Sequence, residues 1–312
     1  MRLRLGWRPI SVAPVNADVG LLARTLRSTF HIRARIPREN PSAQILGTER
    51  MGSGFVVDPG GFLLTVNYVV VGAEELAVVG LDERTYSAEI VRQDFHSGLA
   101  LLRVSERGLP ALPLRRTADL TLGEGIFIVA SVGEGSARVA DGAVSYIGPF
   151  DANWEYILER AIMATAMNPG LGGGPLIDTQ GRVAGIASLN LNDIGRFSLS
   201  IPADYYLDAR DAFVSGARPG GDPRAWLGIF CHAMNDQVVI AGMLSDGPGE
   251  RAGLKPGDVV VAVDGQGVTD RRSLYRLFWA HRPGEPVVLE VVRGKDRHRI
   301  TVESGNAEEF FA

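Results

Sequence analysis

The sequence of 312 residues is poor in cysteine, lysine, aromatic residues and long apolar runs. Cys231 is its single cysteine, which excludes an intrachain disulfide. Lysine occurs only at Lys255 and Lys295, so arginine carries nearly all of the positive charge. No apolar run approaches the roughly 18 residues that a membrane helix needs, and no secretory leader is recognisable. We therefore expect a soluble, cytoplasmic protein without a membrane span.

An excess of either charge is also lacking. The formal net charge of −4 at pH 7 gives no reason to expect nucleic-acid binding. The charge is uneven, however, because residues 1–36 contain seven arginines and one aspartate. Such a basic arm either docks on an acidic partner or stays solvated. We expect no cofactor and no resident metal ion.

Glycine is abundant, with 38 residues, which favours many tight turns over long helices. Short β-type runs occur at 54–57, 62–66, 76–79, 89–92, 100–104, 125–131, 139–147, 156–161, 174–177 and 183–188. Short strands with few helices between them favour antiparallel barrels or a sandwich. The sequence therefore predicts a mainly β protein.

The pattern divides the chain into five parts. They are a basic arm with a short helix (1–30, helix 17–30), a β domain ending in a helix (31–214, helix 203–214), a Gly/Pro-rich linker (215–225), a compact α+β unit (226–303) and an acidic, then apolar tail (304–312). Elements of the α+β unit are expected at 238–244, 259–263, 271–281 (the helix), 287–293 and 299–302.

Three motifs follow one another in the β domain. They are GSGFVVD at 52–58 with LTVNYVV at 64–70, DFHSGLALL at 94–102, and NPGLGGGPLI at 168–177. Together they resemble the trypsin-like domain of the HtrA/Deg serine proteases, in which these segments carry a histidine, an aspartate and a serine. The resemblance covers residues 31–214 and implies two six-stranded antiparallel β-barrels with the site between them.

The residue types that a serine protease needs are missing from these motifs. Tyr68 stands at the histidine position, Gly98 at the aspartate position and Gly172 at the serine position. Gly172 cannot attack a carbonyl, and Gly98 cannot orient a base. A tyrosine phenol with an ordinary pKa of about 10 is a poor base near pH 7. We therefore predict a degenerate triad and a protein that is not an enzyme.

Neighbouring residues leave two chemical alternatives open. Asp94, His96 and Ser97 could form a relocated hydrolytic site, although successive strand residues point to opposite faces. Asp94 and His96 could also hold a metal ion if a third ligand joined them.

The loop that contains the serine position keeps its backbone chemistry. The N–H groups of Gly170, Leu171 and Gly172 could still bind an anion or a carbonyl oxygen without any side chain, as a vestigial oxyanion loop. Alternatively, these residues only maintain a tight turn.

The α+β unit carries a pattern of its own. AGLKPGDVVVAVDG at 252–265 resembles the diagnostic motif of the PDZ domains that follow HtrA-type proteases, and WLGI at 226–229 resembles their carboxylate-binding loop. A PDZ domain binds an extended peptide C-terminus as an added strand, unless it only packs on its neighbour. The resemblance implies the peptide-binding residues Trp226, Leu227, Gly228 and Ile229 in the loop and Ser273, Leu277, Ala280 and His281 on one helix face.

The combination favours one function over two others. We hypothesise a catalytically inactive, bacterial HtrA-like pseudoprotease that acts as a binding, scaffold or regulatory subunit. Its partners would be proteins, in a larger enzyme complex, that engage the PDZ groove, the basic arm or the tail. The apolar end of the tail, Phe310 to Ala312, could itself occupy a PDZ groove, and the resemblance implies a homo-oligomer, a trimer. The alternatives are a peptide-binding chaperone or adaptor, and an unconventional hydrolase or metal-binding protein that uses the remodelled cleft.

Overall fold

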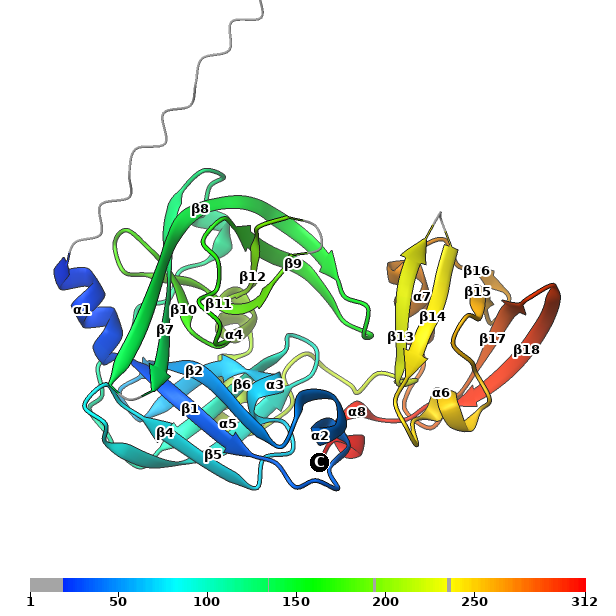
Figure 1. Ribbon diagram of the computed structural model, residues 1–312, viewed down its shortest axis with the longest axis horizontal. Helices are drawn as coiled ribbons and strands as arrows, with labels where there is room; N and C mark the ends of the chain where they lie inside the picture. The colour runs from blue at the N-terminus through cyan, green and yellow to red at the C-terminus, as the bar shows by residue number, and fades with distance from the viewer. Residues whose placement is uncertain (1–18, 134, 193–194, 235–236) are drawn as a thin grey trace, which may run out of the picture.

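The computed structural model describes residues 19–133, 135–192, 195–234 and 237–312. Within them the chain forms two closed antiparallel β-barrels, followed by a separate body in which a sheet packs with helices (Figure 1). The expectation of two six-stranded barrels and a following α+β unit is therefore confirmed. No helix in these described ranges is both long enough and apolar enough to cross a membrane.

The first barrel closes in the strand order β1-β2-β3-β6-β5-β4. After α1 (Val19–Arg27), its elements are β1 (Thr29–Arg35), α2 (Pro41–Leu46), β2 (Glu49–Asp58), β3 (Phe62–Val66), α3 (Asn67–Val70), β4 (Glu75–Val79), β5 (Thr85–Asp94) and β6 (Leu99–Val104). Apolar side chains such as Ile32, Leu64 and Leu101 are fully buried inside it. Gly54 is needed between β1 and β3, because a Cβ there would press on Ile32 and on the Leu64 carbonyl oxygen.

The second barrel closes in the order β10-β11-β12-β9-β8-β7. Its elements are the 3-10 helix η1 (Thr117–Asp119), β7 (Gly125–Gly133), β8 (Ser136–Asp151), β9 (Ile157–Ala164), β10 (Pro175–Asp178), β11 (Val183–Asn190) and β12 (Ser198–Pro202), with α4 (Asp204–Asp208) and α5 (Arg210–Ser215) after it. One cluster of buried apolar side chains extends through both barrels, and this shared core fixes their relative position. The long β8–β9 hairpin leaves the second barrel and reaches toward the third body (Figure 1).

The third body has its own core and the sheet order β13-β14-β15-β17-β18. Its elements are β13 (Ile229–Met234), β14 (Gln237–Met243), α6 (Pro248–Arg251), β15 (Val259–Val263), β16 (Gln266–Gly267), which pairs with β15, α7 (Arg271–Phe278), β17 (Pro286–Arg293) and β18 (Asp296–Glu303), and α8 (Ala307–Phe310) follows in the tail. Leu274, Tyr275 and Phe278 of α7 are completely buried against this sheet. An Asp270 cap on the Ser273 N–H starts the helix.

Two helix predictions need correction. The helix expected over 17–30 ends at Arg27, where the hydroxyls of Thr25, Ser28 and Thr29 hydrogen-bond to carbonyls four residues back. Such bonds compete with helix continuation, and Phe30 instead enters β1. The helix expected over 203–214 is two short helices, because Ala209 leaves the helical conformation at φ −120° and ψ 18°.

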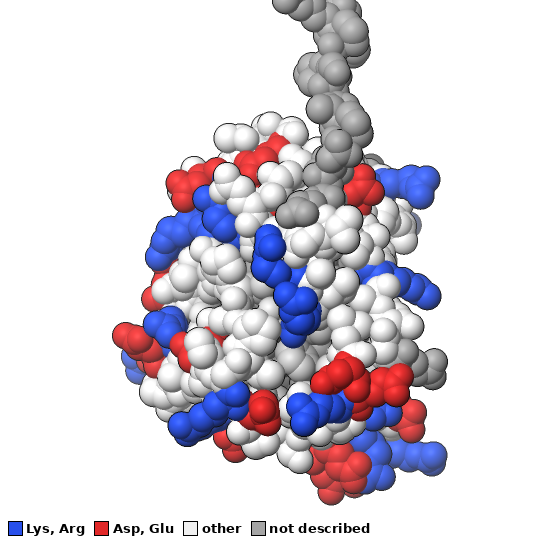
Figure 2. Space-filling view, turned by 90° about the vertical axis from the view of Figure 1, so that its left-hand side faces the viewer, with Lys and Arg blue, Asp and Glu red and all other residues white. Residues whose placement is uncertain are grey.

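Charges of both signs are interspersed on the face from which α1 rises. Figure 2 shows basic and acidic side chains there, separated by broad uncharged areas. Residues 1–18 of the predicted basic arm lie outside the described residues. The docking role expected for the arm therefore stays a prediction.

Candidate functional site

The three triad positions meet in the cleft between the barrels. Tyr68 is the second residue of α3, Gly98 lies in the turn between β5 and β6, and Gly172 lies in the loop between β9 and β10. The N–H of Asn67 donates a 2.7 Å hydrogen bond to the Gly98 carbonyl. The fold thus brings together the positions that the motifs singled out.

The Tyr68 ring fills the space beside Gly172. Its hydroxyl donates a 3.1 Å hydrogen bond to the carbonyl of Ser188 on β11. A Cβ placed on Gly172 would overlap this hydroxyl oxygen. Burial raises the pKa of Tyr68 to about 12. At neutral pH the phenol therefore keeps its proton and cannot serve as a base.

The turn at Gly98 is closed by a second tyrosine. Tyr156, at the end of the β8–β9 hairpin, donates a 2.5 Å hydrogen bond from its hydroxyl to the Ser97 carbonyl. The same hydroxyl would lie 2.9 Å from a Cβ on Gly98. Gly98 has φ +76°, a left-handed conformation that strains most side chains. The backbone there is therefore shaped for glycine.

The relocated hydrolytic site is not assembled as the sequence alternative required. Ser97 is fully buried and donates its hydroxyl to Asp94 at 2.5 Å, within a turn in which Asp94 also accepts from the Ser97 and His96 backbone N–H groups. His96 instead contacts the guanidinium of Arg224. Burial, followed by the Arg224 charge, lowers the pKa of His96 to about 4. These contacts make Asp94 a turn-stabilising residue and leave His96 a weak base.

The metal alternative needs a third ligand next to Asp94 and His96. In the described ranges of the chain, no group of three or more histidine, cysteine, aspartate or glutamate side chains is placed to hold a metal ion.

The vestigial oxyanion loop is held by its own surroundings. The N–H of Gly170 donates to the side-chain oxygen of Asn168 at 3.2 Å, and the Gly172 carbonyl accepts from the Ser53 N–H at 2.8 Å. Leu171 lies between them and is half-buried. The predicted binding of an anion or carbonyl by this loop stays a prediction.

A carboxylate of the same chain lies at the WLGI loop of the third body. The N–H groups of Leu227 and Ile229 donate to the two side-chain oxygens of Glu155 at 3.1 and 2.7 Å. Gly228 between them has φ +73°, which turns both N–H groups toward one point. Trp226 takes no part in this, because its N–H pairs with Gly305 and its ring faces the tail.

The α7 residues expected to line the groove make contacts within their own domain. Ser273 accepts from the Asp270 N–H at the start of the helix, and His281 lies 2.8 Å from a carboxylate oxygen of Asp264. Leu277 packs on the domain core, and Ala280 is exposed. Their peptide-binding role stays a prediction. The contacts of α7 with the β8–β9 hairpin, which the sequence did not indicate, come from other residues and are taken up below.

The tail does not enter the groove of its own chain, so that part of the expectation is wrong. The rings of Phe310 and Phe311 pack on Trp226 at centroid distances of 4.7 and 5.7 Å, and Phe311 stacks on Phe95 at 6.2 Å. Apolar burial against the first barrel thus determines where the tail lies. Whether it reaches a groove in another chain stays a prediction.

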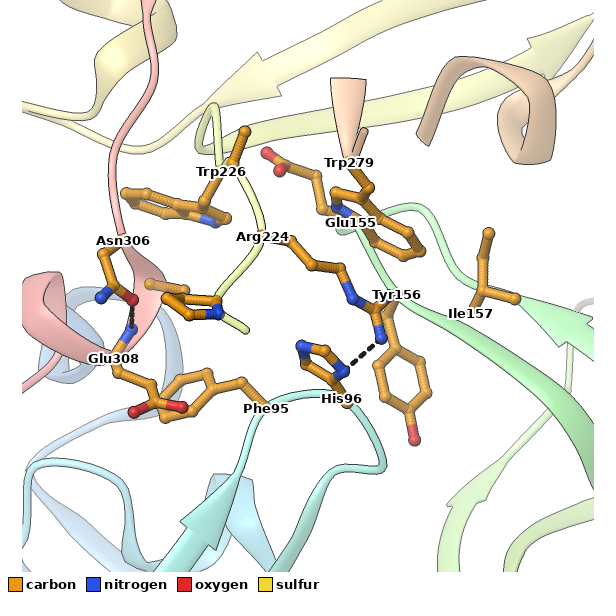
Figure 3. A pocket seen from close by; sticks show the side chains of 13 residues that line it. Phe95, His96, Glu155, Tyr156, Ile157, Arg224, Trp226, Trp279, Asn306 and Glu308 are labelled. Carbon is orange, nitrogen blue, oxygen red and sulfur yellow. Dashed lines mark hydrogen bonds between the residues drawn. The ribbon is translucent and has the colours of Figure 1, made fainter. Parts of the chain in front are cut away.

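A small cavity lies where the first barrel, the linker and the third body meet. Figure 3 shows Arg224 between His96 and Trp279, with its guanidinium 4.3 Å from a ring centre of Trp279. The cavity volume of about 60 Å³ leaves room for a few water molecules. It is therefore part of the packing between domains rather than a substrate site.

Comparison with known families defines the class of protein. Residues 52–186 match the model of the trypsin-like peptidase domain, and residues 225–303 match that of the PDZ domain. The chain is thus a mainly β protein with trypsin-like barrels followed by a PDZ domain.

The similar proteins found by comparison are of the HtrA/DegP type. The chain is 34% identical to "Probable periplasmic serine endoprotease DegP-like" of Halomonas elongata, over 85% of this chain and 59% of that protein. It is 29% identical to the protein of the same name from Ectopseudomonas mendocina, over 99% of this chain and 67% of that protein. The solved structure "HtrA-type protease AlgW with tripeptide" is 27% identical, with a TM-score of 0.56 over 91% of this chain and 95% of that one. The chain is therefore similar to HtrA/DegP-type proteases, and it spans about two thirds or less of the length of these curated relatives.

Proposed function

We propose that the protein is a catalytically inactive HtrA-type pseudoprotease that acts as a protein-binding, scaffold or regulatory subunit. The observation that supports this most is the Tyr68 hydroxyl, which fills the space that a serine side chain at Gly172 would need. Loss of the nucleophile alone typically costs about 10⁶-fold in kcat. In this cleft the base position is also blocked, because the buried phenol keeps its proton.

The PDZ domain supports the binding part of the proposal. Its carboxylate loop keeps the backbone N–H geometry that captures a carboxylate, as the contacts of Leu227 and Ile229 illustrate. We therefore propose a protein partner that presents an extended peptide. A homo-oligomer, a trimer, and a cytoplasmic location are also proposed, although the relatives are named periplasmic. Light scattering of the purified chain and cell fractionation test these two points.

Turnover measurements test the inactivity. Casein and a fluorogenic peptide library are incubated with the protein, with an active HtrA-type protease as the positive control. A fluorophosphonate probe tests for a reactive serine in parallel. We expect no turnover and no labelling above background. Turnover that survives repurification and disappears in Ser97→Ala or Ser53→Ala would refute the proposal.

A further inference from the structure

The tip of the β8–β9 hairpin occupies the PDZ groove. The N–H of Cys231, on β13, donates a 2.7 Å hydrogen bond to the Asn153 carbonyl. Two residues further along the hairpin, the Glu155 carboxylate accepts from Leu227 and Ile229. Glu155 has φ +38°, a rare conformation for a residue with a side chain, and it turns the chain back toward β9.

These contacts follow the pattern of an added strand. In that mode a backbone carbonyl of the ligand pairs with the sheet edge, and the carboxylate at the ligand's end enters the loop. Here the side-chain carboxylate of Glu155 takes the place of a chain terminus. The hairpin tip is therefore equivalent to a short peptide bound in the groove, with Asn153 two residues before the terminal position.

Side chains of α7, on the other side of the groove, bind a second acidic group. Arg271 and Arg272 lie 2.8 and 3.2 Å from the two carboxylate oxygens of Asp151, four residues before Glu155. Tyr275 donates its hydroxyl to the Ala152 carbonyl at 3.0 Å. Arg271 and Arg272 are half-buried and Tyr275 is buried, so these contacts are shielded from solvent between α7 and the hairpin.

We propose that this groove selects extended protein C-termini that carry an acidic residue four positions before the terminal carboxylate, and that residues 151–155 are a built-in ligand which such a C-terminus must displace. The proposal deepens the proposed protein-binding function and rests on it. It assigns Arg271 and Arg272 to the recognition of the upstream acid and the Leu227–Ile229 loop to the terminal carboxylate.

Charge gives the external ligand an advantage over the built-in one. Burial raises the pKa of Glu155 to about 7, although the N–H groups of Ile229, Leu227 and Gly228 lower it. A peptide α-carboxyl has an ordinary pKa of about 3.5 and is fully ionised at neutral pH. The hydrogen bonds of the loop are stronger to an ionised acceptor. A C-terminus of the right register is therefore a competent competitor.

The test uses the full chain and a fluorescein-labelled pentapeptide, Asp-Ala-Asn-Trp-Val with a free carboxylate, followed by fluorescence anisotropy. The wild type is compared with Glu155→Ala, which removes the built-in carboxylate. Glu159→Ala is the matched control, because Glu159 forms an exposed ion pair with Arg276 across the same contact and lies away from the loop. We expect Glu155→Ala to bind the peptide on the order of tenfold more tightly than the wild type, and Glu159→Ala to bind within about threefold of it.

Two further peptides test the recognised chemistry. The C-terminal amide removes the terminal carboxylate and is expected to abolish binding. Replacement of the first aspartate by asparagine is expected to weaken binding to Glu155→Ala by about fivefold. This difference should shrink in Glu155→Ala/Arg272→Ala and vanish in Glu155→Ala/Arg271→Ala/Arg272→Ala, because both arginines pair with the acid. Equal affinity of wild type and Glu155→Ala, or indifference to both peptide changes, would overturn the proposal.

Hydrogen exchange keeps the test independent of how well Glu155→Ala folds. In the wild type without peptide, the amides of Leu227, Ile229 and Cys231 should be protected. Saturating peptide should increase exchange at the buried Ala152 of the displaced hairpin, whose N–H donates to the Tyr156 carbonyl. Fast exchange at the three amides in the free protein would contradict a built-in ligand. Absence of any peptide binding would overturn this inference and leave the inactivity proposal intact, because turnover is measured separately.

Discussion

The cleft between the barrels and the PDZ groove differ in the chemical groups that they present. In the cleft, Gly98 and Gly172 stand where side chains would act, and the hydroxyls of Tyr156 and Tyr68 fill the space. In the groove, the backbone N–H groups remain in place and hold the carboxylate of Glu155. Side-chain chemistry can be lost through single substitutions, whereas recognition by backbone groups needs only the loop conformation.

The two regions are joined by consecutive residues. Glu155 lies in the groove, and Tyr156 donates to Ser97 beside Gly98. A change in the groove can therefore alter the turn at Gly98 through one hairpin. The predictions below test whether the cleft is closed by packing and whether the groove is closed by a weak, titratable contact.

The largest effect is expected from Gly172→Ser. The new side chain would overlap the Tyr68 hydroxyl, so we expect a loss of about 2–3 kcal/mol in the free energy of unfolding. Urea denaturation measures it. Tyr68→His/Gly172→Ser is the matched control, because the smaller ring vacates the space and should recover most of the loss. A Gly172→Ser variant as stable as the wild type would mean that the cleft is not closed by packing.

Restoring the three side chains should not restore efficient catalysis. Tyr68→His/Gly98→Asp/Gly172→Ser supplies the residue types of a triad, but position 98 would keep a left-handed backbone and meet the Tyr156 hydroxyl. We expect turnover of a fluorogenic peptide to stay at least 10³-fold below that of an active HtrA-type control, because misplaced catalytic groups contribute little. Activity within tenfold of that control would show that the cleft geometry is intact.

A smaller effect is expected from Tyr156→Phe. The variant leaves the Ser97 carbonyl without its 2.5 Å partner, and loss of such a hydrogen bond costs about 1 kcal/mol. Tyr146→Phe on β8 is the matched control, because its hydroxyl bonds to the Pro149 carbonyl at an exposed site. Chemical denaturation should show a loss for Tyr156→Phe that exceeds the loss for Tyr146→Phe. Equal losses would place Tyr156 outside the closure of the Gly98 turn.

The groove should open as pH rises. The docked Glu155 carboxyl has a pKa of about 7 against an ordinary value of 4.5, so the docked hairpin holds its proton more firmly than a free one. Docking is therefore strongest below pH 4.5 and weakens as the pH rises through 7. Among the groups that face Glu155, burial raises the pKa of Cys231 to about 12 and also raises the pKa of Tyr275, and Arg271 carries a guanidinium.

Peptide affinity at two pH values measures this effect. The ratio of the wild-type dissociation constant to that of Glu155→Ala should fall severalfold between pH 5 and pH 8. The same ratio for Glu155→Gln, which cannot ionise, should stay constant. A wild-type ratio that rises with pH would reverse the sign of the expected linkage.

The sequence predicted the barrels and the cleft more completely than the groove. The resemblance of three ordered motifs to the HtrA/Deg serine proteases located Tyr68, Gly98 and Gly172, and the fold brings these positions together. It did not indicate that Tyr68 would cover Gly172. That contact depends on the packing of residues more than 100 positions apart.

The hairpin contact could not be predicted for a different reason. Asn153 meets Cys231 through backbone groups alone, and the Glu155 carboxylate meets backbone N–H groups of the loop, so the groove side of the contact leaves no residue pattern in the sequence. The predicted α7 face includes Ser273, whose hydroxyl accepts from the N–H of the N-cap residue Asp270, and its peptide-binding role stays a prediction. A cue existed in the acidic residues at the hairpin tip and the arginines at the start of the helix, which are complementary in charge.

The smallest expected effect is a difference in coupling energy between two ion pairs of the contact between the hairpin and α7. Glu159 and Arg276 lie 2.8 Å apart with side chains more than half exposed, whereas Arg272 and Asp151 lie 3.2 Å apart with about a quarter of each exposed. Exposed pairs contribute about 0–1 kcal/mol and are screened by salt, while less solvated pairs are screened less. A double-mutant cycle is carried out on each pair, and hairpin docking is measured by hydrogen exchange of the Ile229 amide. The coupling energy should be smaller for Glu159–Arg276. Addition of 0.5 M salt should remove that coupling and retain most of the Arg272–Asp151 coupling. If both couplings disappear together in salt, the contact is a general attraction between charged surfaces, and the groove does not specifically recognise the upstream acidic residue.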